Sequence, residues 1–273
     1  NIYVTNVRRR ATDIPPTLRK YTFVPNNDTQ KEVDPFYHSV DVATQIVIDN
    51  CMQDLNLGIV EIGSDNAIPI LKSNIDRENL KKITFSQVDT IDKISTDYNL
   101  IIASDELSLK NIEAYMKRAE FVFAKVQNIE SKEVDVIYQH TSKSGSYILM
   151  RRPKEAPENS TIIVANNNNY NWVRDLKLAV KKHKAPGSRI YLINEDFNSG
   201  IIGLFNSIRL EQYCSNLRVF LLRSYDKIEP FSLKSDFYLP QIRNDLTVNI
   251  YQDGCWGTYR RLPLETFQPT LMS

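Results

Sequence analysis

The chain has 273 residues, enough for two ordinary domains, and its 42% hydrophobic, 25% charged and 10% aromatic residues exclude a disordered or fibrous protein. The 34 Lys and Arg residues almost balance the 33 Asp and Glu residues, so no charge excess favours a nucleic acid as partner. No apolar run reaches the roughly 18 to 20 residues of a membrane span. The three widely spaced cysteines favour free thiols in the cytoplasm, and the start without Met predicts a piece of a longer protein.

The first 34 residues are interpreted as a linker segment. A short strand is expected over residues 2–7, and a stretch rich in Pro, Asn and charge follows it. From residue 35 to residue 153, helical and strand patterns alternate, which predicts a first α/β domain. Its expected helices cover 39–56, with Ser39 as N-cap, 67–80 and 108–119; its expected strands cover 59–62, 82–89, 98–107, 120–127, 133–141 and 145–153, the last two as an antiparallel hairpin.

A shift to Pro and charge at "RRPKEAPENS" predicts a boundary, so that residues 154–273 form a second α/β domain. Its expected strands cover 161–165, 188–196 and 216–224, its expected helices 171–183 and 200–213, and two closing strands lie within 246–265. Strands that alternate with helices predict parallel sheets covered by helices. The fold class is therefore α/β, with two Rossmann-like domains.

The sequence offers little chemistry. Only 8 glycines occur, and no GxGxxG, Walker or GxSxG motif is present. No tyrosine begins the Tyr-x-x-x-Lys pair with which short-chain reductases protonate a carbonyl oxygen, so the second domain is not a self-sufficient reductase of that kind. The three histidines lie near no cysteine or second histidine, so no zinc spacing exists. We therefore predict no catalytic residue and no metal ligand.

The stretch "GIVEIGSDNA", residues 58–67, is typical of a strand that runs into a nucleotide-binding turn. Glu61 and Gly63, with Asp89 at the end of the next strand, correspond to positions with which methyltransferases hold S-adenosylmethionine. Asp65 and Ala67 stand where such a loop has further glycines, and they spoil the close backbone approach that the cofactor requires. The link after Asp89 is also too short for a helix-plus-strand crossover. We interpret the loop as vestigial, without bound cofactor; the alternative is a methyltransferase with residual S-adenosylmethionine binding.

Both halves together resemble the central region of an animal type I fatty acid synthase, of an insect or another invertebrate. The second half resembles the family's pseudo-ketoreductase, and the passage into it resembles the end of the pseudo-methyltransferase. The residues that carry the resemblance are "NDLTVNIYQDGCWGTYRRLPLE" (244–265), "GIIGLFNSIRLEQYCSNLRVFLL" (200–222), "GSYILMRRP" (145–153), "YNWVRDLK" (170–177) and, from the segment that leaves the dehydratase, "PPTLRKYTFVPN" (15–26).

The resemblance implies a non-catalytic scaffold. The first domain would be a degenerate S-adenosylmethionine-methyltransferase-like fold, and the second a truncated short-chain-reductase-like fold that supports the catalytic ketoreductase. The parent would be a homodimeric multienzyme that makes long-chain fatty acids from acetyl-CoA, malonyl-CoA and NADPH. Its NADPH and phosphopantetheine lie outside this segment, and its dehydratase, enoyl reductase and ketoreductase belong to the same polypeptide. A docking or regulatory module is a further alternative.

Three aromatic residues near the end of the second domain are candidates for an interface. Large amphipathic side chains such as Tyr251, Trp256 and Tyr259 are suited to interfaces between proteins. The alternative is that they fill the local core of the domain.

Overall fold

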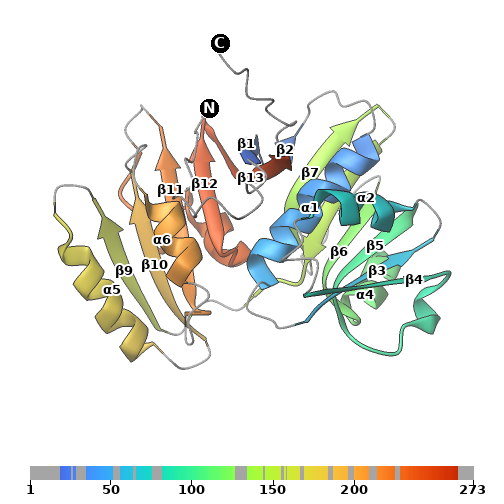
Figure 1. Cartoon of the computed structure of the whole chain (residues 1–273), viewed down its shortest axis with the longest axis horizontal. Coiled ribbons are helices and arrows are strands. Elements are labelled where there is room, and N and C mark those ends of the chain that lie inside the picture. Colours follow the sequence, from blue (N-terminus) through green and yellow to red (C-terminus); the bar gives the residue numbers. More distant parts are fainter. Residues whose placement is uncertain are drawn as a thin grey trace, which may run out of the picture.

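The computed structural model consists of two α/β units, each built on its own β-sheet (Figure 1). Apolar strand segments bounded by turn residues form the sheets, and amphipathic helices cover them. The structure describes residues 19–25, 27–28, 35–51, 56–63, 66–75, 82–126, 134–143, 145–154, 157, 159–166, 169–183, 187–195, 200–208, 214–224 and 228–263.

The first unit contains a seven-stranded sheet with the order β2-β7-β8-β6-β5-β3-β4. All neighbours pair in parallel except β8, which lies antiparallel between β6 and β7. Its elements are β2 (Asn27–Asp28), α1 (Pro35–Cys51), β3 (Leu57–Ile62), α2 (Ala67–Asn74), β4 (Ile83–Val88), the 3-10 helix η1 (Ile91–Lys93), β5 (Tyr98–Glu106), α4 (Leu109–Met116), β6 (Ala119–Val126), β7 (Asp135–Ser142) and β8 (Gly145–Arg151).

Apolar layers cover both faces of this sheet. On one face, α1 and α2 pack on Ile59, Leu100 and Phe121, which alternate with residues of the opposite face along their strands. On the other face, α4 and the segment around η1 pack on Ile101 and Val122. The strands are buried on both sides, as the apolar run of β5 predicts for a parallel sheet.

The second unit contains a six-stranded sheet with the order β1-β13-β12-β11-β10-β9. Strands β9 to β12 are parallel and follow one another in sequence order, whereas β13 runs antiparallel to β12. Helices α5 and α6 lie over one face of this sheet, and the segment that contains α7 covers the other face. Its elements are β1 (Arg19–Pro25), β9 (Asn159–Ala165), α5 (Asn171–Lys182), β10 (Ser188–Asn194), α6 (Ile201–Ile208), β11 (Leu217–Arg223), α7 (Leu239–Asn244), β12 (Val248–Gln252) and β13 (Cys255–Pro263).

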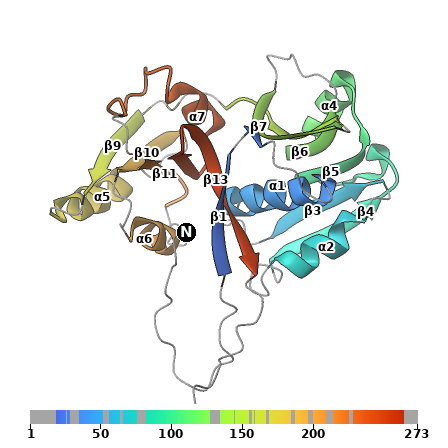
Figure 2. The same cartoon turned by 90° about the horizontal axis from the view of Figure 1, so that it is seen from above.

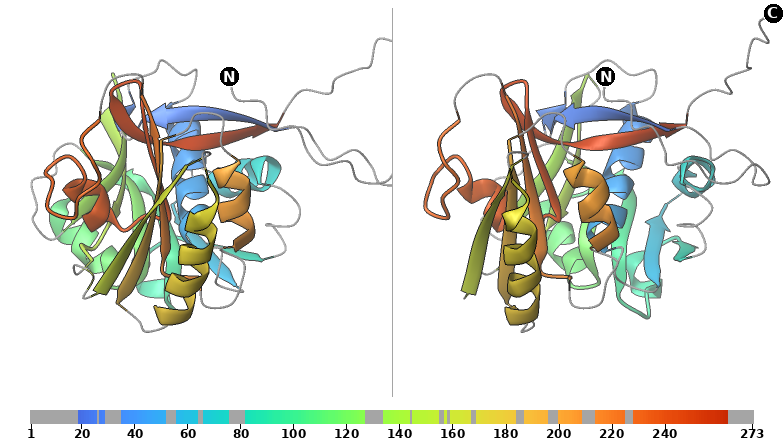
Figure 3. Two further views of the ribbon diagram at one scale, coloured as in Figure 1. Left: turned by 90° about the vertical axis from the view of Figure 1, so that its left-hand side faces the viewer. Right: turned by 60° about the vertical axis from the view of Figure 1, so that its left-hand side comes forward.

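Strand β1 differs from the expectation of a linker over residues 1–34. It pairs antiparallel with β13 over its whole length, from Arg19 opposite Pro263 to Pro25 opposite Gly257. The resulting ribbon lies between the two units beside α1 (Figure 2) and extends across the ends of the other strands (Figure 3). The chain therefore contributes a strand to the second sheet before it builds the first unit. The strand expected over residues 2–7 lies outside the described residues.

The expected fold class of two Rossmann-like α/β units is confirmed. The β7–β8 hairpin forms as expected. Strand β4 lies at the edge of the sheet beside β3, and η1 is the helical element between β4 and β5. The expected N-cap is wrong: α1 begins at Pro35, which suits the first turn of a helix, and Ser39 lies inside it. The Ser39 hydroxyl donates to the carbonyl of Pro35 instead.

Candidate functional site

The carboxyl ends of β3 and β5 are where a ligand of a doubly wound sheet would bind. Strand β3 comes first in the chain, β4 lies on one side of it and β5 on the other, so the strand order reverses here. Crevices at such reversals are the usual ligand sites of open α/β sheets. The stretch that contains Glu61 and Gly63 leads directly into this position.

The carboxylate of Glu61 is turned into the protein and is fully buried. Its Oε1 accepts a hydrogen bond of 2.8 Å from the backbone N–H of Ala67, and its Oε2 accepts one of 3.3 Å from that of Ile68. Both donors belong to the first turn of α2, where N–H groups lack helical partners and the helix dipole favours negative charge. The side chain of Asn66 makes no capping hydrogen bond, so Glu61 supplies the cap from the neighbouring strand.

Gly63 is required by the packing between β3 and β5. Its φ of 107° lies in a region that L side chains rarely adopt, and a Cβ at this position would lie 2.8 Å from the Cβ of Ser104 on β5. Its N–H donates to the carbonyl of Val88 at 3.2 Å, and its carbonyl accepts from Nε2 of Gln87 at 3.0 Å. The turn is therefore tied to the end of β4 and packed against β5.

The structure describes two of the other three members of the loop that the sequence predicts to be vestigial. Ala67 is buried at the start of α2, and Asp65 lies outside the described residues. Asp89 is exposed and forms an ion pair with Lys93, which lowers its pKa through a hydrogen bond and charge attraction. The structure brings Glu61 and Ala67 into contact, places Gly63 beside them, and leaves Asp89 in solvent.

The corresponding edge of the second sheet carries a small apolar cavity. Its volume is about 290 Å³, and Trp172, Val173 and Leu204 line it between α5 and α6. The nearby side-chain amide of Asn194 already has partners within the protein. Its nitrogen donates to the carbonyl of Ala165 at 3.1 Å, and its oxygen accepts from Arg223 at 3.0 Å. Strands β9 to β12 follow one another without a reversal of order, so this part of the sheet has no switch point like that of the first unit.

The three aromatic interface candidates pack inside the second unit. Trp256 contacts Tyr251, with ring centroids 5.2 Å apart, and lies edge-on to Phe220 at 5.8 Å. Tyr259 packs on the opposite face of the sheet, where burial raises its pKa although Arg223 acts against that rise. All three are half-buried, and these contacts are those of the core-filling alternative. Their role at an interface stays a prediction.

Sequence reasoning missed the polar junction between the two units. The guanidinium of Arg151, at the end of β8, is buried and donates to Glu120 at 2.8 Å and to the backbone carbonyl of Asn244 at 2.8 Å. It also lies over the ring of Phe121, with 4.7 Å between its Cζ and the ring centroid. Burial lowers the pKa of Arg151, and the carboxylate of Glu120 opposes that shift.

Asp245 follows Asn244 and is the centre of a buried ionic cluster. Its two carboxylate oxygens accept paired hydrogen bonds of 2.7 Å from Arg189 and of 2.8 and 3.0 Å from Arg218. Burial alone would raise the pKa of Asp245, but the two guanidinium groups outweigh it and hold that pKa well below its usual value. Lys154 lies 3.9 Å from the same carboxylate and 3.0 Å from Glu120, so it connects this cluster to Arg151.

A second contact joins α1 of the first unit to the residues that follow Asp245 in the second unit. The side-chain carbonyl of Asn50 accepts from the backbone N–H of Thr247 at 2.6 Å and from its hydroxyl at 3.0 Å. Leu246 packs into the apolar core of the first unit. A local sequence signal for these contacts is absent, because the partners are about 90 to 200 residues apart in the chain.

Within the described ranges, no group of three or more His, Cys, Asp or Glu side chains is arranged to hold a metal ion. No helix in that part of the chain combines the length and hydropathy that crossing a membrane requires.

Comparison with known proteins supports the reading of the second unit. Residues 169–264 match the family model "Fatty acid synthase, pseudo-KR domain", a range that runs from the start of α5 to the end of β13. The expected resemblance is confirmed, because this part of the chain is similar to the pseudo-ketoreductase domain of fatty acid synthases.

Two solved structures show a distant similarity. Phosphoethanolamine N-methyltransferase 2 of Haemonchus contortus with S-adenosyl-L-methionine is 9% identical over 80% of this chain and 75% of that chain, with a TM-score of 0.27. The same enzyme with phosphomonomethylethanolamine and S-adenosylhomocysteine is 9% identical over 77% and 74%, with a TM-score of 0.26. The fold assignment rests on the sheet topology and not on these overlaps.

Proposed function

We propose that this chain, which carries a fatty acid synthase pseudo-ketoreductase region, is a non-catalytic structural segment of a multifunctional fatty acid synthase. The parent enzyme makes long-chain fatty acids from acetyl-CoA, malonyl-CoA and NADPH in the cytoplasm, as a homodimer. Its cofactors, NADPH and phosphopantetheine, bind elsewhere in the polypeptide. The second unit supports the catalytic ketoreductase, and the dehydratase and enoyl reductase are further neighbours in the same chain.

The observation that carries this proposal is the packing at the switch point of the first sheet. The acid that would face a cofactor, Glu61, caps α2 with both of its oxygens, and Ser104 lies against Gly63 where a ligand would enter. Both oxygens of this buried carboxylate are directed at the start of α2 and not at solvent. The engagement of Glu61 at the start of α2, in a unit with the sheet of a cofactor-binding fold, supports the non-catalytic assignment.

The polar junction supports a structural role for both units. Arg151 and Asn50 bind backbone groups of the second unit, so that each unit satisfies buried polar groups of the other. Strand β1, which precedes the first unit in the chain, completes the sheet of the second. A segment with these contacts suits the task of holding neighbouring catalytic domains in a fixed arrangement.

The decisive experiment compares the catalytic ketoreductase of the parent enzyme with and without residues 154–273. We expect the ketoreductase alone to lose thermal stability and activity, and co-expression with the present chain to restore both. Full activity and an unchanged melting temperature without these residues would contradict a supporting role. Calorimetric titration of the chain with S-adenosylmethionine tests the non-catalytic assignment of the first unit, because micromolar binding would contradict it.

A further inference from the structure

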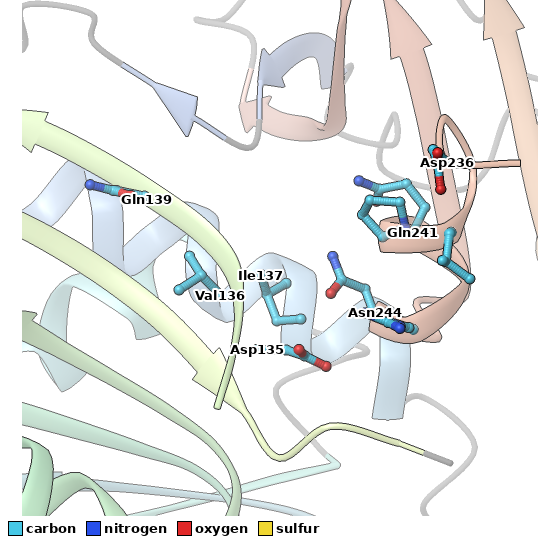
Figure 4. Close-up of a pocket in the computed structure, with 10 residues that line it drawn as sticks. Asp135, Val136, Ile137, Gln139, Asp236, Gln241 and Asn244 are labelled. Atoms are coloured by element: carbon cyan, nitrogen blue, oxygen red, sulfur yellow. The ribbon is translucent and has the colours of Figure 1, made fainter. Parts of the chain in front are cut away.

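A cleft between the two units lies far from the β3–α2 turn and carries features that the scaffold role does not use. Its volume is about 490 Å³, within the usual range of ligand sites. One wall is β7, with Asp135, Val136 and Ile137, and the other is the α7 segment, with Asp236, Gln241 and Asn244 (Figure 4).

The wall made by β7 includes an open stretch of strand edge. Strand β8 pairs with one side of β7, and on the other side β2 pairs only with Gln139 and His140. Among the described strands, none pairs with this outer side between Asp135 and Ile137. An open edge of this kind offers backbone N–H and C=O groups to an added strand. The added strand would pair with the part of β7 that β2 does not reach.

The same stretch carries a buried carboxylate oxygen that lacks a partner. Oδ2 of Asp135 is inaccessible to solvent and has no hydrogen-bond donor in the structure. Burial raises the pKa of Asp135, although the charges of Arg151 and Arg243 act in the opposite direction. A buried acceptor without a donor is costly, and an incoming cationic donor would remove that cost.

The charge of the cleft also favours a basic partner. Asp135 and Asp236 contribute two negative charges to its lining and Arg243 contributes one positive charge, so the lining has a formal charge of −1. The side chain of Val136 is 39% exposed and gives the edge an apolar contact point. An uncharged strand would leave Oδ2 of Asp135 without a donor, so this acid discriminates in favour of a strand with a cationic side chain.

We propose that the cleft between β7 and α7 binds an extended protein segment that pairs with the open edge of β7 and places a Lys or Arg side chain on Asp135. Pairing of the main chain supplies affinity, and the acid selects the side chain. This binding site goes beyond the scaffold role and does not depend on it.

The test uses the whole chain and three probes: an end-capped Val-Lys-Val-Lys-Val peptide, the same peptide with Glu in place of Lys, and butylammonium. We expect the Lys peptide to bind by calorimetry and to slow hydrogen exchange of the amides in residues 135–137. The Glu peptide and butylammonium should bind at least about tenfold more weakly.

Two variants in the cleft and one control away from it locate the site. Asp135→Asn keeps the shape of the side chain and should weaken the Lys peptide about tenfold, whereas Asp105→Asn, at an exposed acid away from the cleft, should leave its affinity unchanged. Val136→Lys is a second variant, at the surface of the cleft. It places a positive charge, of the same sign as that of the Lys peptide, on the exposed edge of β7. Absence of binding at about 1 mM Lys peptide, equal binding of the Glu peptide or of butylammonium, or unchanged exchange at residues 135–137 would overturn the proposal. An affinity that changes with neither Asp135→Asn nor Val136→Lys would overturn it as well.

Discussion

Nη1 of Arg151 donates a hydrogen bond to the backbone carbonyl of Asn244, so that a side chain of the first unit completes the C-terminal end of helix α7 in the second. A helix leaves its last carbonyls without intrahelical donors, and a buried carbonyl needs a partner. Through this bond and the ion pair with Glu120, Arg151 connects β6 and β8 of one unit to α7 of the other.

Replacement of Arg151 by Met should therefore destabilise the whole chain. The change leaves the buried carbonyl of Asn244 without a donor, which costs about 1–3 kcal/mol. Loss of the ion pair with Glu120 adds little, because Glu120 is half-exposed and solvent screens its charge. Urea unfolding followed by far-UV circular dichroism measures the change. The neighbouring and exposed Arg152→Met is the matched control, for which we expect at most about 0.5 kcal/mol. Equal effects of the two variants would show that Arg151 does not join the units.

The cluster around Asp245 predicts a larger effect. Asp245→Asn keeps the size of the side chain, and Asn tolerates the φ of 47° at this position, so backbone strain is not introduced. The change leaves the buried Arg218 and the half-buried Arg189 without a counter-charge, and we expect a loss of about 3–5 kcal/mol. A loss below about 1 kcal/mol would mean that the two guanidinium groups find other partners.

The same carboxylate sets a pH dependence. Because the pKa of Asp245 is lower in the folded chain than in the unfolded chain, its contribution to stability is present above the unfolded value of 3.8 and is lost as the pH falls below it. The free energy of unfolding of the native chain should therefore fall more steeply below about pH 4 than that of Asp245→Asn. Chemical unfolding at a series of pH values gives both curves, and parallel acid limbs would contradict the assignment.

The sequence predicted the features that depend on neighbouring residues. The apolar run of β11, buried throughout, and the turn at Gly63 follow from local pattern and from the conformational freedom of glycine. The pairing of β1 with β13 could not be predicted, since more than 200 residues separate the strands and a short edge strand has no signal of its own. Arg151 and Asp245 were missed for the same reason: their partners meet only after both sheets have formed.

Ser39 shows how two local signals can compete. A Ser before an apolar periodic run favours an N-cap, but Pro35 four residues earlier has a fixed φ that suits the first turn. The helix starts at the proline, and the serine becomes an internal residue.

The capping role of Glu61 can be tested by Glu61→Gln. The amide keeps one acceptor for the N–H groups of Ala67 and Ile68 but loses the charge that the helix N-terminus favours, so we expect a loss of about 1–2 kcal/mol. Thermal unfolding of this variant beside Glu106→Gln, at an exposed position of the same sheet, separates the cap from a general charge effect. An unchanged melting temperature of Glu61→Gln would show that the carboxylate does not hold α2.

The packing of Gly63 against Ser104 can be tested by a double-mutant cycle. Gly63→Ala introduces a Cβ that meets the Cβ of Ser104 at 2.8 Å and places alanine at a φ of 107°, which together should cost about 2–4 kcal/mol. In the double variant with Ser104→Gly, the collision is removed and the backbone strain stays, so that about half of the loss should be recovered. The unfolding free energies of the native chain, the two single variants and the double variant form a double-mutant cycle. We expect a coupling energy of about 1–2 kcal/mol from it. Additive effects would show that β3 and β5 are not in contact at their carboxyl ends, and the crevice of the first sheet would then be open to a ligand.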